Sequence, residues 1–554
     1  MPPINADNMS YTFVISIFLI IVLITAFFKY RKWKRRKKFM ASLRASWGVP
    51  KQEFNSEDLV QQYFIYKNKD TSQKTLNDQI CDDLDFSELF KYLDRTTSVV
   101  GQQYLFAHLR NRDIKKEELL DFDNAVEYFS ANKPDREKTQ EIISSLQNFD
   151  AFYLTELMFG MMAQKPKWYP VIPLLFSMTI LSIILIPFYH AIGLLTIFLI
   201  PVNCVFHYLN KNNIKPYMLS FPQLLKLLEA CILLKNLNLP IKIKHQTDKE
   251  ISSIKSIKRS LFFVSLDEYL ESDEGILGWF VIELLKSFFL IEVMGFYTAL
   301  KSIENKRNDI HQLFSYIGYY DTILSTASLR NGLPYYCKPV FSEDKKQIKF
   351  KEIYHPLIAD CVTNDLEING KSILLTGSNM SGKTTFVRTV AINNILAQTL
   401  NTCFAKEFQI PVLNTYSAIR ISDNLMESKS YYFEEVLTIK ELINKVENNE
   451  ESLFMIDELF KGTNTIERVA AAKAVLSYLN KNNNIVFAST HDIELADLLK
   501  DEYDLYHFTE TIEKEQLIFD YKLKTGKLTT RNAIRILELN GYPAEIIMEA
   551  RKLS

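Results

Sequence analysis

The sequence predicts an α/β domain of the P-loop NTPase class in the C-terminal part of the chain, preceded by a mostly α-helical region with transmembrane helices. Three observations lead to this fold class. A glycine-rich loop, G-x-x-x-x-G-K-T, lies between an apolar run and a helix-like segment within residues 373–396. Two further apolar runs, 453–456 and 485–488, end in polar residues. Two uncharged stretches, 11–28 and 168–210, have the length of one and two membrane spans.

The glycine-rich loop is the strongest signal. Residues 373–375 predict a buried strand and residues 386–396 a helix, so the loop has the strand–loop–helix context that a phosphate-binding loop requires. In that geometry backbone N–H groups face a polyphosphate, Lys383 reaches its β- and γ-phosphates, and the Thr384 hydroxyl ligates Mg²⁺. A chance glycine-rich turn is the weaker alternative, because the chain has only 15 glycines. The predicted ATP contacts of the loop are Gly377, Ser378, Asn379, Met380, Ser381, Gly382, Lys383, Thr384 and Thr385.

Two strand ends downstream supply groups for hydrolysis. Asp457 and Glu458 follow the second apolar run, which suits Asp457 to hold Mg²⁺ with Thr384, and Glu458 to polarise an attacking water. His491 follows the third run and is predicted to sense the γ-phosphate. Either group alone is more often an ordinary polar residue at a strand end. Together with the loop, they predict a catalytic set of Glu458, His491 and Lys383.

Four segments then resemble, in order, the ATPase domain of the MutS mismatch-repair family. They are TGSNMSGKTT (376–385), ISDNLMESKSYYFEE (421–435), MIDELFKGTNT (455–465) and ASTHD (488–492). The resemblance covers roughly 81–110 and 310–554. It implies ATP and Mg²⁺ as cofactors and a homodimer in which a loop of one subunit contacts the γ-phosphate of the other. That loop would be Gly462, Thr463, Asn464 and Thr465, and Val362 would lie where the family packs the adenine.

The match to the family departs at several positions. Asn464 stands where the family usually has a serine, so an amide would make the contact between subunits. Ser378 and Ser381 replace a proline and a glycine of the loop. Asn379, Ser430 and Glu435 agree with family positions.

Hydropathy and charge divide the remaining chain into segments. Residues 11–28 are mostly apolar, and eight Lys and Arg residues follow within 29–38, which predicts a cytoplasmic C-terminal flank. Residues 168–210 contain no Asp, Glu, Lys or Arg and predict a hairpin that turns near 187–190, with a buried soluble helix pair as the alternative. The predicted domains are 1–40, a transmembrane anchor; 41–167, helical core; 168–210, transmembrane hairpin; 211–345, helical core and lever; 346–530, ATPase; and 531–554, a helical dimerisation segment.

A third apolar region, 276–296, contains Glu283, Lys286 and Glu292. Each charge would cost about 2.5 to 3.5 kcal/mol in a spanning helix, so this region is interpreted as a core or dimer-interface helix. The segments together predict a multi-pass protein of the inner (cytoplasmic) membrane, with the lipid bilayer as a partner and the ATPase domain in the cytoplasm.

Composition narrows the partners. The 554 residues carry a net charge of −1, and without the eight basic residues beside the anchor the remainder carries −9, which argues against strong non-specific nucleic-acid binding. Six cysteines show no C-x-x-C pair and predict no zinc site. Too little cytoplasmic chain precedes Leu93 for the family's mismatch-reading N-terminal domain. DNA is a partner through the resemblance only, and no DNA-binding residue is predicted.

Three functions fit these observations to different degrees. One is a membrane-anchored MutS-family ATPase of the mismatch-repair type that engages DNA. Another is an ATPase that uses the same ATP-hydrolysing domain to remodel a DNA structure or a complex at the membrane. An ABC-transporter half fits less well, because its L-S-G-G-Q signature and additional spans are missing from the sequence.

Overall fold

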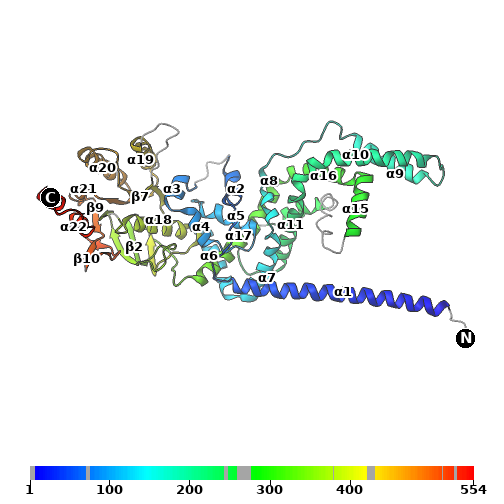
Figure 1. Ribbon diagram of the computed structural model, residues 1–554, viewed down its shortest axis with the longest axis horizontal. Coiled ribbons are helices and arrows are strands. Elements are labelled where there is room, and N and C mark those ends of the chain that lie inside the picture. The colour runs from blue at the N-terminus through cyan, green and yellow to red at the C-terminus, as the bar shows by residue number, and fades with distance from the viewer. Residues whose placement is uncertain are drawn as a thin grey trace.

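The molecule is elongated in the computed structural model, with two β-sheets at one end, a helical body in the middle and a projecting helical hairpin at the other end (Figure 1). The structure describes residues 6–69, 75–242, 247–258, 276–378, 380–420, 431–513, 516–528 and 533–553.

The larger sheet has six strands in the order β12-β9-β4-β8-β7-β6, all parallel except β12. Its three central strands are the apolar runs identified from the sequence, and they are buried because helices cover a parallel sheet on both faces. Their carboxyl ends therefore meet at one edge, as predicted. The strands are β4 (Ser372–Thr376), β6 (Asn414–Ala418), β7 (Ser452–Asp457), β8 (Ile485–Thr490), β9 (Tyr503–His507) and β12 (Lys524–Thr525).

The smaller sheet has the order β1-β5-β2-β3, and a separate hairpin pairs β10 with β11. Helix α18 begins directly after the glycine-rich loop and packs on β7 and β8. The other elements of this end are β1 (Val340–Phe341), β2 (Gln347–Ile353), β3 (Asn364–Asn369), β5 (Glu407–Ile410), β10 (Glu510–Glu513), β11 (Gln516–Phe519), α18 (Lys383–Leu400), α19 (Tyr431–Glu447), α20 (Thr465–Leu479), α21 (Ile493–Leu499), α22 (Ala533–Leu539) and α23 (Ala544–Leu553).

The helical body is built around α17, a 26-residue helix that packs on α5 and α6. It confirms the mostly helical pattern of this region. Its helices are α2 (Glu57–Asn68), α3 (Asp78–Asp83), α4 (Phe86–Leu93), α5 (Val99–Leu109), α6 (Lys116–Ala131), α7 (Lys133–Ile143), α8 (Leu154–Phe159), α11 (Ser220–Asn236), α12 (Asp248–Lys255) and α17 (Arg307–Gly332), with short 3-10 turns η1 (Ser144–Leu146) and η2 (Phe149–Tyr153).

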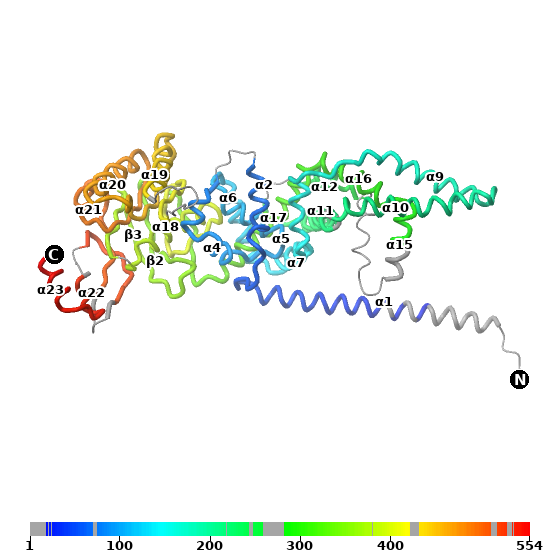
Figure 2. The backbone as a smooth tube through the Cα atoms, turned by 45° about the horizontal axis from the view of Figure 1, so that its top comes forward, coloured from blue at the N-terminus to red at the C-terminus, as the bar shows by residue number. Residues whose placement is uncertain are grey.

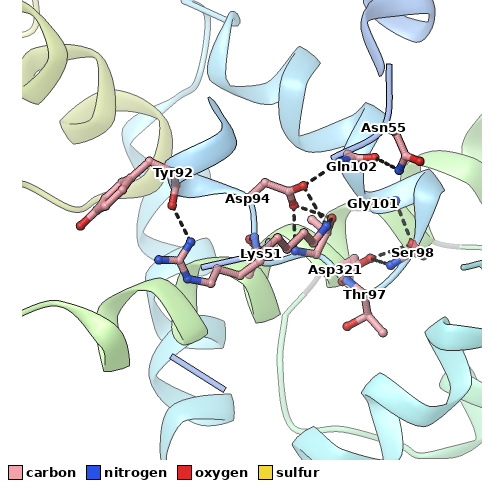
Figure 3. A network of polar contacts seen from close by, with 12 residues as sticks. Lys51, Asn55, Tyr92, Asp94, Thr97, Ser98, Gly101, Gln102 and Asp321 are labelled. Carbon is pink, nitrogen blue, oxygen red and sulfur yellow. Dashed lines mark hydrogen bonds and ion pairs between the residues drawn. The ribbon is translucent and has the colours of Figure 1, made fainter. Parts of the chain in front are cut away.

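A buried carboxylate on α17 fixes the start of α5 (Figure 3). Asp321 accepts the backbone N–H groups of Thr97 and Ser98 at 2.8 and 2.7 Å, and the Ser98 hydroxyl at 2.6 Å. Gly101 lies so close that a Cβ there would fall 2.1 Å from the Asp321 Oδ2. The segment Leu-Asp-Arg-Thr-Thr at 93–97, which lies in the 81–110 range that resembles the family, and Gly101 after it therefore serve helix packing. Burial raises the pKa of Asp321 to about 6.

Arg330, near the end of α17, joins the helical body to the sheet-bearing end. Its guanidinium is buried and donates to Asp123 of α6 at 2.7 Å, and to the Thr402 hydroxyl and the Asn401 carbonyl at 2.9 Å. Thr402 and Asn401 directly follow α18. The glycine-rich loop is thus connected to α17 through a single helix.

The apolar stretch predicted as a hairpin forms two antiparallel helices, α9 (Val171–Leu185) and α10 (Ile192–Met218), with turns over the predicted 187–190. Within the described residues one segment, Ile192–Lys215, is long and apolar enough to cross a membrane, whereas α9 has only 15 residues. The prediction of two spans in this hairpin is therefore not supported beyond α10, and a multi-pass arrangement is not supported.

The predicted anchor lies in α1 (Ala6–Ala45), a 40-residue helix that includes the basic cluster. The side chains at 6–17, 20, 21 and 24 are outside the described ones, so the anchor stays a prediction. Both views show α1 and the hairpin extending away from the sheets on the same side of the helical body (Figures 1 and 2).

The region predicted as a single core or interface helix is two helices, α15 (Ile276–Phe289) and α16 (Ile291–Glu304). They are separated at Leu290, which is buried and has a left-handed φ of 53°. α15 packs mainly on α10, and α16 packs on α9, α10 and α17.

Candidate active site

The glycine-rich loop connects β4 to α18 with a backbone that only glycine adopts easily. Gly382 precedes α18 with φ 106°, and Gly377 follows β4 with φ 151°. A Cβ on Gly377 would also lie 2.8 Å from the carbonyl oxygen of Phe508. The sequence context of the loop is confirmed, whereas Asn379 lies outside the described residues.

Lys383 begins α18 and is folded back over the loop. Its ammonium donates to the carbonyl oxygens of Gly377 and Ser378 at 2.9 and 2.8 Å. Burial lowers its pKa, which the nearby carboxylates of Asp457 and Glu458 oppose. The positive charge is therefore held at the helix N-terminus, where an anionic ligand is favoured.

The two predicted metal ligands come together. The Thr384 hydroxyl at the start of α18 donates to Asp457 Oδ2 at 2.7 Å, and Ser489 at the end of β8 donates to the other oxygen of Asp457. A hydroxyl and a carboxylate are oxygen donors of the kind that Mg²⁺ prefers, and Mg²⁺ usually combines one or two such groups with substrate phosphates. No group of three or more His, Cys, Asp or Glu side chains that could hold a metal occurs among the described residues. The donors thus fit a Mg²⁺ held jointly with a polyphosphate.

Glu458 and His491, from the ends of β7 and β8, are in direct hydrogen-bonding contact. Lys461 approaches the same carboxylate to 2.9 Å. Burial on its own raises the pKa of Glu458, but the hydrogen bonds from His491 and Lys461 outweigh it and lower the pKa to about 2. Glu458 is therefore an ionised carboxylate at neutral pH, the form required of a general base.

A cavity of about 560 Å³ opens beside the loop and suits a nucleotide in size. Val362 lines it, as the resemblance implied, together with Met380, Lys383, Thr384 and Thr385. Sequence reasoning missed several other members of the wall. These are Ile353, Ile358, Ala359, Asp360, Asn364, Phe386, Thr389, Phe508 and Tyr521.

Tyr521 is the most informative of the missed residues, because its aromatic ring is half exposed in a cavity that otherwise has few rings. Asn364 holds the backbone on both sides of it: its amide donates to the Tyr521 carbonyl at 3.1 Å, and its oxygen accepts the Leu523 N–H at 2.8 Å. The segment around Tyr521 resembles the family, but its distance of more than 130 residues from the loop hides this contact in the sequence.

The predicted subunit-bridging loop, Gly462 to Thr465, lies elsewhere. Among the described residues that line the cavity, none belongs to this loop. Asn464 caps α20: its side-chain oxygen accepts the Glu467 N–H at 3.0 Å, and its amide donates to the Glu467 carboxylate at 2.7 Å. The loop is solvent-exposed, with the N-terminus of α20 facing outward.

Two more carboxylates support the site, of which Glu435 agrees with a family position and Glu510 was not predicted. Glu510 on β10 is buried and accepts the Ser378 hydroxyl at 2.6 Å, which fastens the loop at the position where the family has proline. Glu435, at the start of α19, is fully buried and accepts the Phe460 N–H in the turn after Glu458. Burial raises the pKa of Glu435. Ser430 lies outside the described residues.

Comparison with known proteins identifies a family for this end of the chain. The model of MutS domain V matches residues 373–554. A DNA mismatch repair protein MutS from Pseudothermotoga lettingae is 32% identical over 265 residues, covering 46% of this chain and 32% of that protein. The proteins of that name from Thermus thermophilus and Listeria monocytogenes are 30% and 31% identical, covering 42% and 40% of this chain and 28% and 26% of their own lengths. The chain thus spans about a third or less of these relatives.

Proposed function

We propose that this chain, whose residues 373–554 match MutS domain V, is a membrane-associated ATPase of the MutS family that hydrolyses Mg-ATP in sites shared between two copies of the chain. The observation that carries the proposal is the contact between Thr384 and Asp457 at 2.7 Å, directly beside the Glu458–His491 pair. Metal ligands, water-activating base and phosphate loop then occupy the same edge of one sheet.

The residues of the site divide the chemistry among them. Lys383 exchanges its two carbonyl partners for phosphate oxygens when a nucleotide enters. Thr384 and Asp457 hold Mg²⁺, which neutralises charge on the β- and γ-phosphates when it is bound. Glu458 orients a water for attack on the γ-phosphorus and accepts its proton, and His491 holds that carboxylate in place.

Lys461 has a separate part in this proposal. It holds the Glu458 carboxylate by an ion pair and lies directly before the exposed loop at Gly462. The shared site that we propose brings this loop to the γ-phosphate of a second copy. The exposed N-terminus of α20 supports this contact, because helix N-termini favour phosphate.

The arrangement of the hairpin supports membrane association. Its interior contains several polar side chains among apolar ones and its exterior is apolar, whereas a soluble helix pair carries its polar side chains outside. Thr179 and Asn203 are fully buried, and the Asn203 amide donates to the Thr179 hydroxyl at 2.9 Å. Leu194 and Phe198, in contrast, are 74% and 67% exposed. In water this exterior would be an exposed apolar patch, whereas in lipid it is solvated.

The second candidate function is an ATPase that acts at the membrane without recognising mismatches. The acidic remainder of the chain favours it over DNA binding, because phosphate contacts need basic side chains. The relatives' names refer to DNA mismatch repair, so DNA is tested directly below.

The decisive experiment compares ATP binding and turnover of the purified full-length chain with three variants. Glu458→Gln should keep nucleotide binding and lose turnover by about a hundred-fold or more, since the base no longer accepts a proton. Lys383→Ala should lose both, and Glu441→Gln, at an exposed position of α19, should change neither. Turnover of Glu458→Gln close to that of the unaltered protein would refute the assignment.

Mixing two inactive variants tests the shared site. Lys383→Ala and Asn464→Ala each damage one half of a site, so a mixed dimer retains one intact site and should recover part of the activity. Co-assembly of the two variants without recovery of activity contradicts the shared site. Adding mismatched or fully paired DNA to the unaltered protein should give similar turnover. A response specific to the mismatch would favour the DNA-reading function instead.

A further inference from the structure

The charges of the α15–α16 region point into the protein. Lys286 and Glu292 are 3% exposed and lie 3.7 Å apart across the break between the helices. Glu283 is 2.8 Å from Lys211 of α10, and His207 of α10 lies between Glu283 and Glu292 at 3.6 and 3.5 Å. Two ammonium groups and two carboxylates thus balance within one cluster, so the cost that the sequence assigns to three isolated charges does not apply.

The same cluster supports a strained turn. Leu290 has a left-handed φ of 53°, a conformation that costs a leucine on the order of 1 kcal/mol. Asn203 of α10 donates at 2.6 Å to the carbonyl of Phe288, two residues before Leu290, and the Lys286–Glu292 pair spans the turn. Contacts from α10 therefore stabilise the break that redirects the chain from α15 into α16.

As a result, α15 runs across the hairpin rather than along it in both views (Figures 1 and 2). Its partners on α10 are Asn203, His207 and Lys211. Asn203 lies roughly 16 Å along α10 from its first residue, and His207 and Lys211 lie roughly 22 and 28 Å along it, at 1.5 Å per residue. Since the hydrocarbon core of a bilayer is about 30 Å thick, a hairpin inserted from its tip would place the Glu283 end of this crossing at the lipid–water boundary and the Phe288 end deeper.

The outward side of α15 is apolar where the structure describes it. Leu285 is 46% exposed, whereas Lys286 beside it is buried. The helix therefore has the same reversed arrangement as α9 and α10, with charged groups inside and an apolar side chain outside. A surface helix bathed only in water is expected to show the opposite.

We propose that α15 is an interfacial helix that lies in the plane of the bilayer at the base of the hairpin, with lipid as the partner of its outward face. The ion cluster holds it there. This inference rests on the proposed membrane association, and it adds a second membrane-contacting element that differs from a span in depth.

The test measures the depth of single nitroxide labels in the full-length chain, reconstituted in phosphatidylcholine–phosphatidylglycerol vesicles after replacement of the native cysteines. Labels replace three leucines of similar exposure: Leu181 on α9 (57%), Leu285 on α15 (46%) and Leu498 on α21 (53%). Collision rates with oxygen and with a water-soluble nickel chelate report depth. We expect Leu181 in the hydrocarbon, Leu498 in water and Leu285 at the boundary between them.

Every other outcome refutes one part of the proposal. A label at Leu285 as accessible to nickel as one at Leu498, with Leu181 in lipid, refutes the interfacial helix and leaves the membrane hairpin intact. A label at Leu285 as deep as at Leu181 also refutes it, in favour of an embedded helix. Leu181 in water refutes the membrane association itself and this inference with it, while the ATPase assays stay independent.

A charge exchange tests what holds the helix. Glu283→Lys should place two ammonium groups beside His207 and raise the nickel accessibility of the Leu285 label several-fold. The double variant Lys211→Glu/Glu283→Lys restores an opposite-charge pair and should return accessibility close to its original value. If the double variant is no closer to the original than the single one, the cluster does not position α15. ATP binding by both variants checks that the chain has folded.

Discussion

The sheet domain and the hairpin differ in which kinds of side chain they bury and which they expose. In the sheet domain, Leu374, Met455 and Phe487 are fully buried and polar groups gather at the strand ends, where water and a ligand reach them. In the hairpin, Asn203 is buried while Phe198 is exposed. The kinds of side chain that face inward therefore indicate whether a region is surrounded by water or by an apolar medium, even where its overall hydropathy is ambiguous.

The largest expected effect comes from placing one charge on each exterior. Leu181 and Leu498 are 57% and 53% exposed. Leu181→Asp should weaken the proposed membrane association by about a hundred-fold, because an aspartate that faces hydrocarbon costs up to about 2.5 to 3.5 kcal/mol, the value for the centre of a membrane helix. Leu498→Asp should change it by less than about two-fold, since surface substitutions in water stay within about 0.5 kcal/mol. The measurement is the fraction of protein that floats with vesicles.

Equal flotation of the two aspartate variants would remove the distinction between the exteriors. Bound ATP provides the control, because both variants should retain the nucleotide affinity of the unaltered protein. A loss of binding in Leu181→Asp would instead indicate a general folding defect.

The sequence predicts those features of the structure that depend on residues close together in the chain. The loop, Asp457, Glu458 and His491 were predictable because short motifs fix their positions at the ends of consecutive buried strands. Tyr521 and Glu510 were not, because they reach the site through β10, β11 and the segment after them, at separations of more than 130 residues. No local pattern marks such contacts.

The 276–296 region shows a second limit. Its charges were evaluated one at a time, which is correct for a helix alone in lipid. The structure pairs Glu283 with Lys211 and Lys286 with Glu292, and pairing depends on how helices far apart in sequence meet. The short length of α9 was hidden for a similar reason, since an apolar composition does not fix where a helix begins.

The titration of Asp321 tests how much free energy a buried charge costs in the helical body, away from the hairpin. Burial raises its pKa from 3.8 to about 6, so the folded state favours the protonated carboxyl. Its stabilising contribution is complete below pH 3.8 and is lost as the pH rises through about 6. At 1.36 kcal/mol per pKa unit the loss amounts to about 3 kcal/mol.

The measurement compares the unaltered chain with Asp321→Asn, which does not titrate. Urea unfolding of the helical body, followed by hydrogen exchange in α5 and α17, should show the stability of the unaltered chain falling relative to that of the variant between about pH 4 and 7. A constant difference across this range would mean that Asp321 is ionised in the folded protein as readily as in the unfolded chain.

The smallest expected effect on stability distinguishes the interior of the sheet domain from the interior of the hairpin. Asn394 on α18 and Asn203 on α10 are both fully buried. Asn394 donates to the Thr415 hydroxyl at 2.8 Å, and Asn203 donates to the Thr179 hydroxyl at 2.9 Å. Asn394→Leu should cost about 2 kcal/mol, because a buried hydroxyl loses its donor in a domain whose unfolded state is hydrated.

Asn203→Leu should cost only about 0.6 kcal/mol, the average for hydrogen bonds between membrane helices, because the separated helices find other partners in lipid. Hydrogen exchange of the α18 and α10 amides in reconstituted protein gives both values as opening free energies. The apolar exterior of the hairpin and the smaller free-energy cost of its asparagine substitution would then have one cause, the medium that surrounds the hairpin. Equal costs for the two asparagines would mean that the hairpin separates into water, and its apolar exterior would need a protein rather than a lipid to cover it.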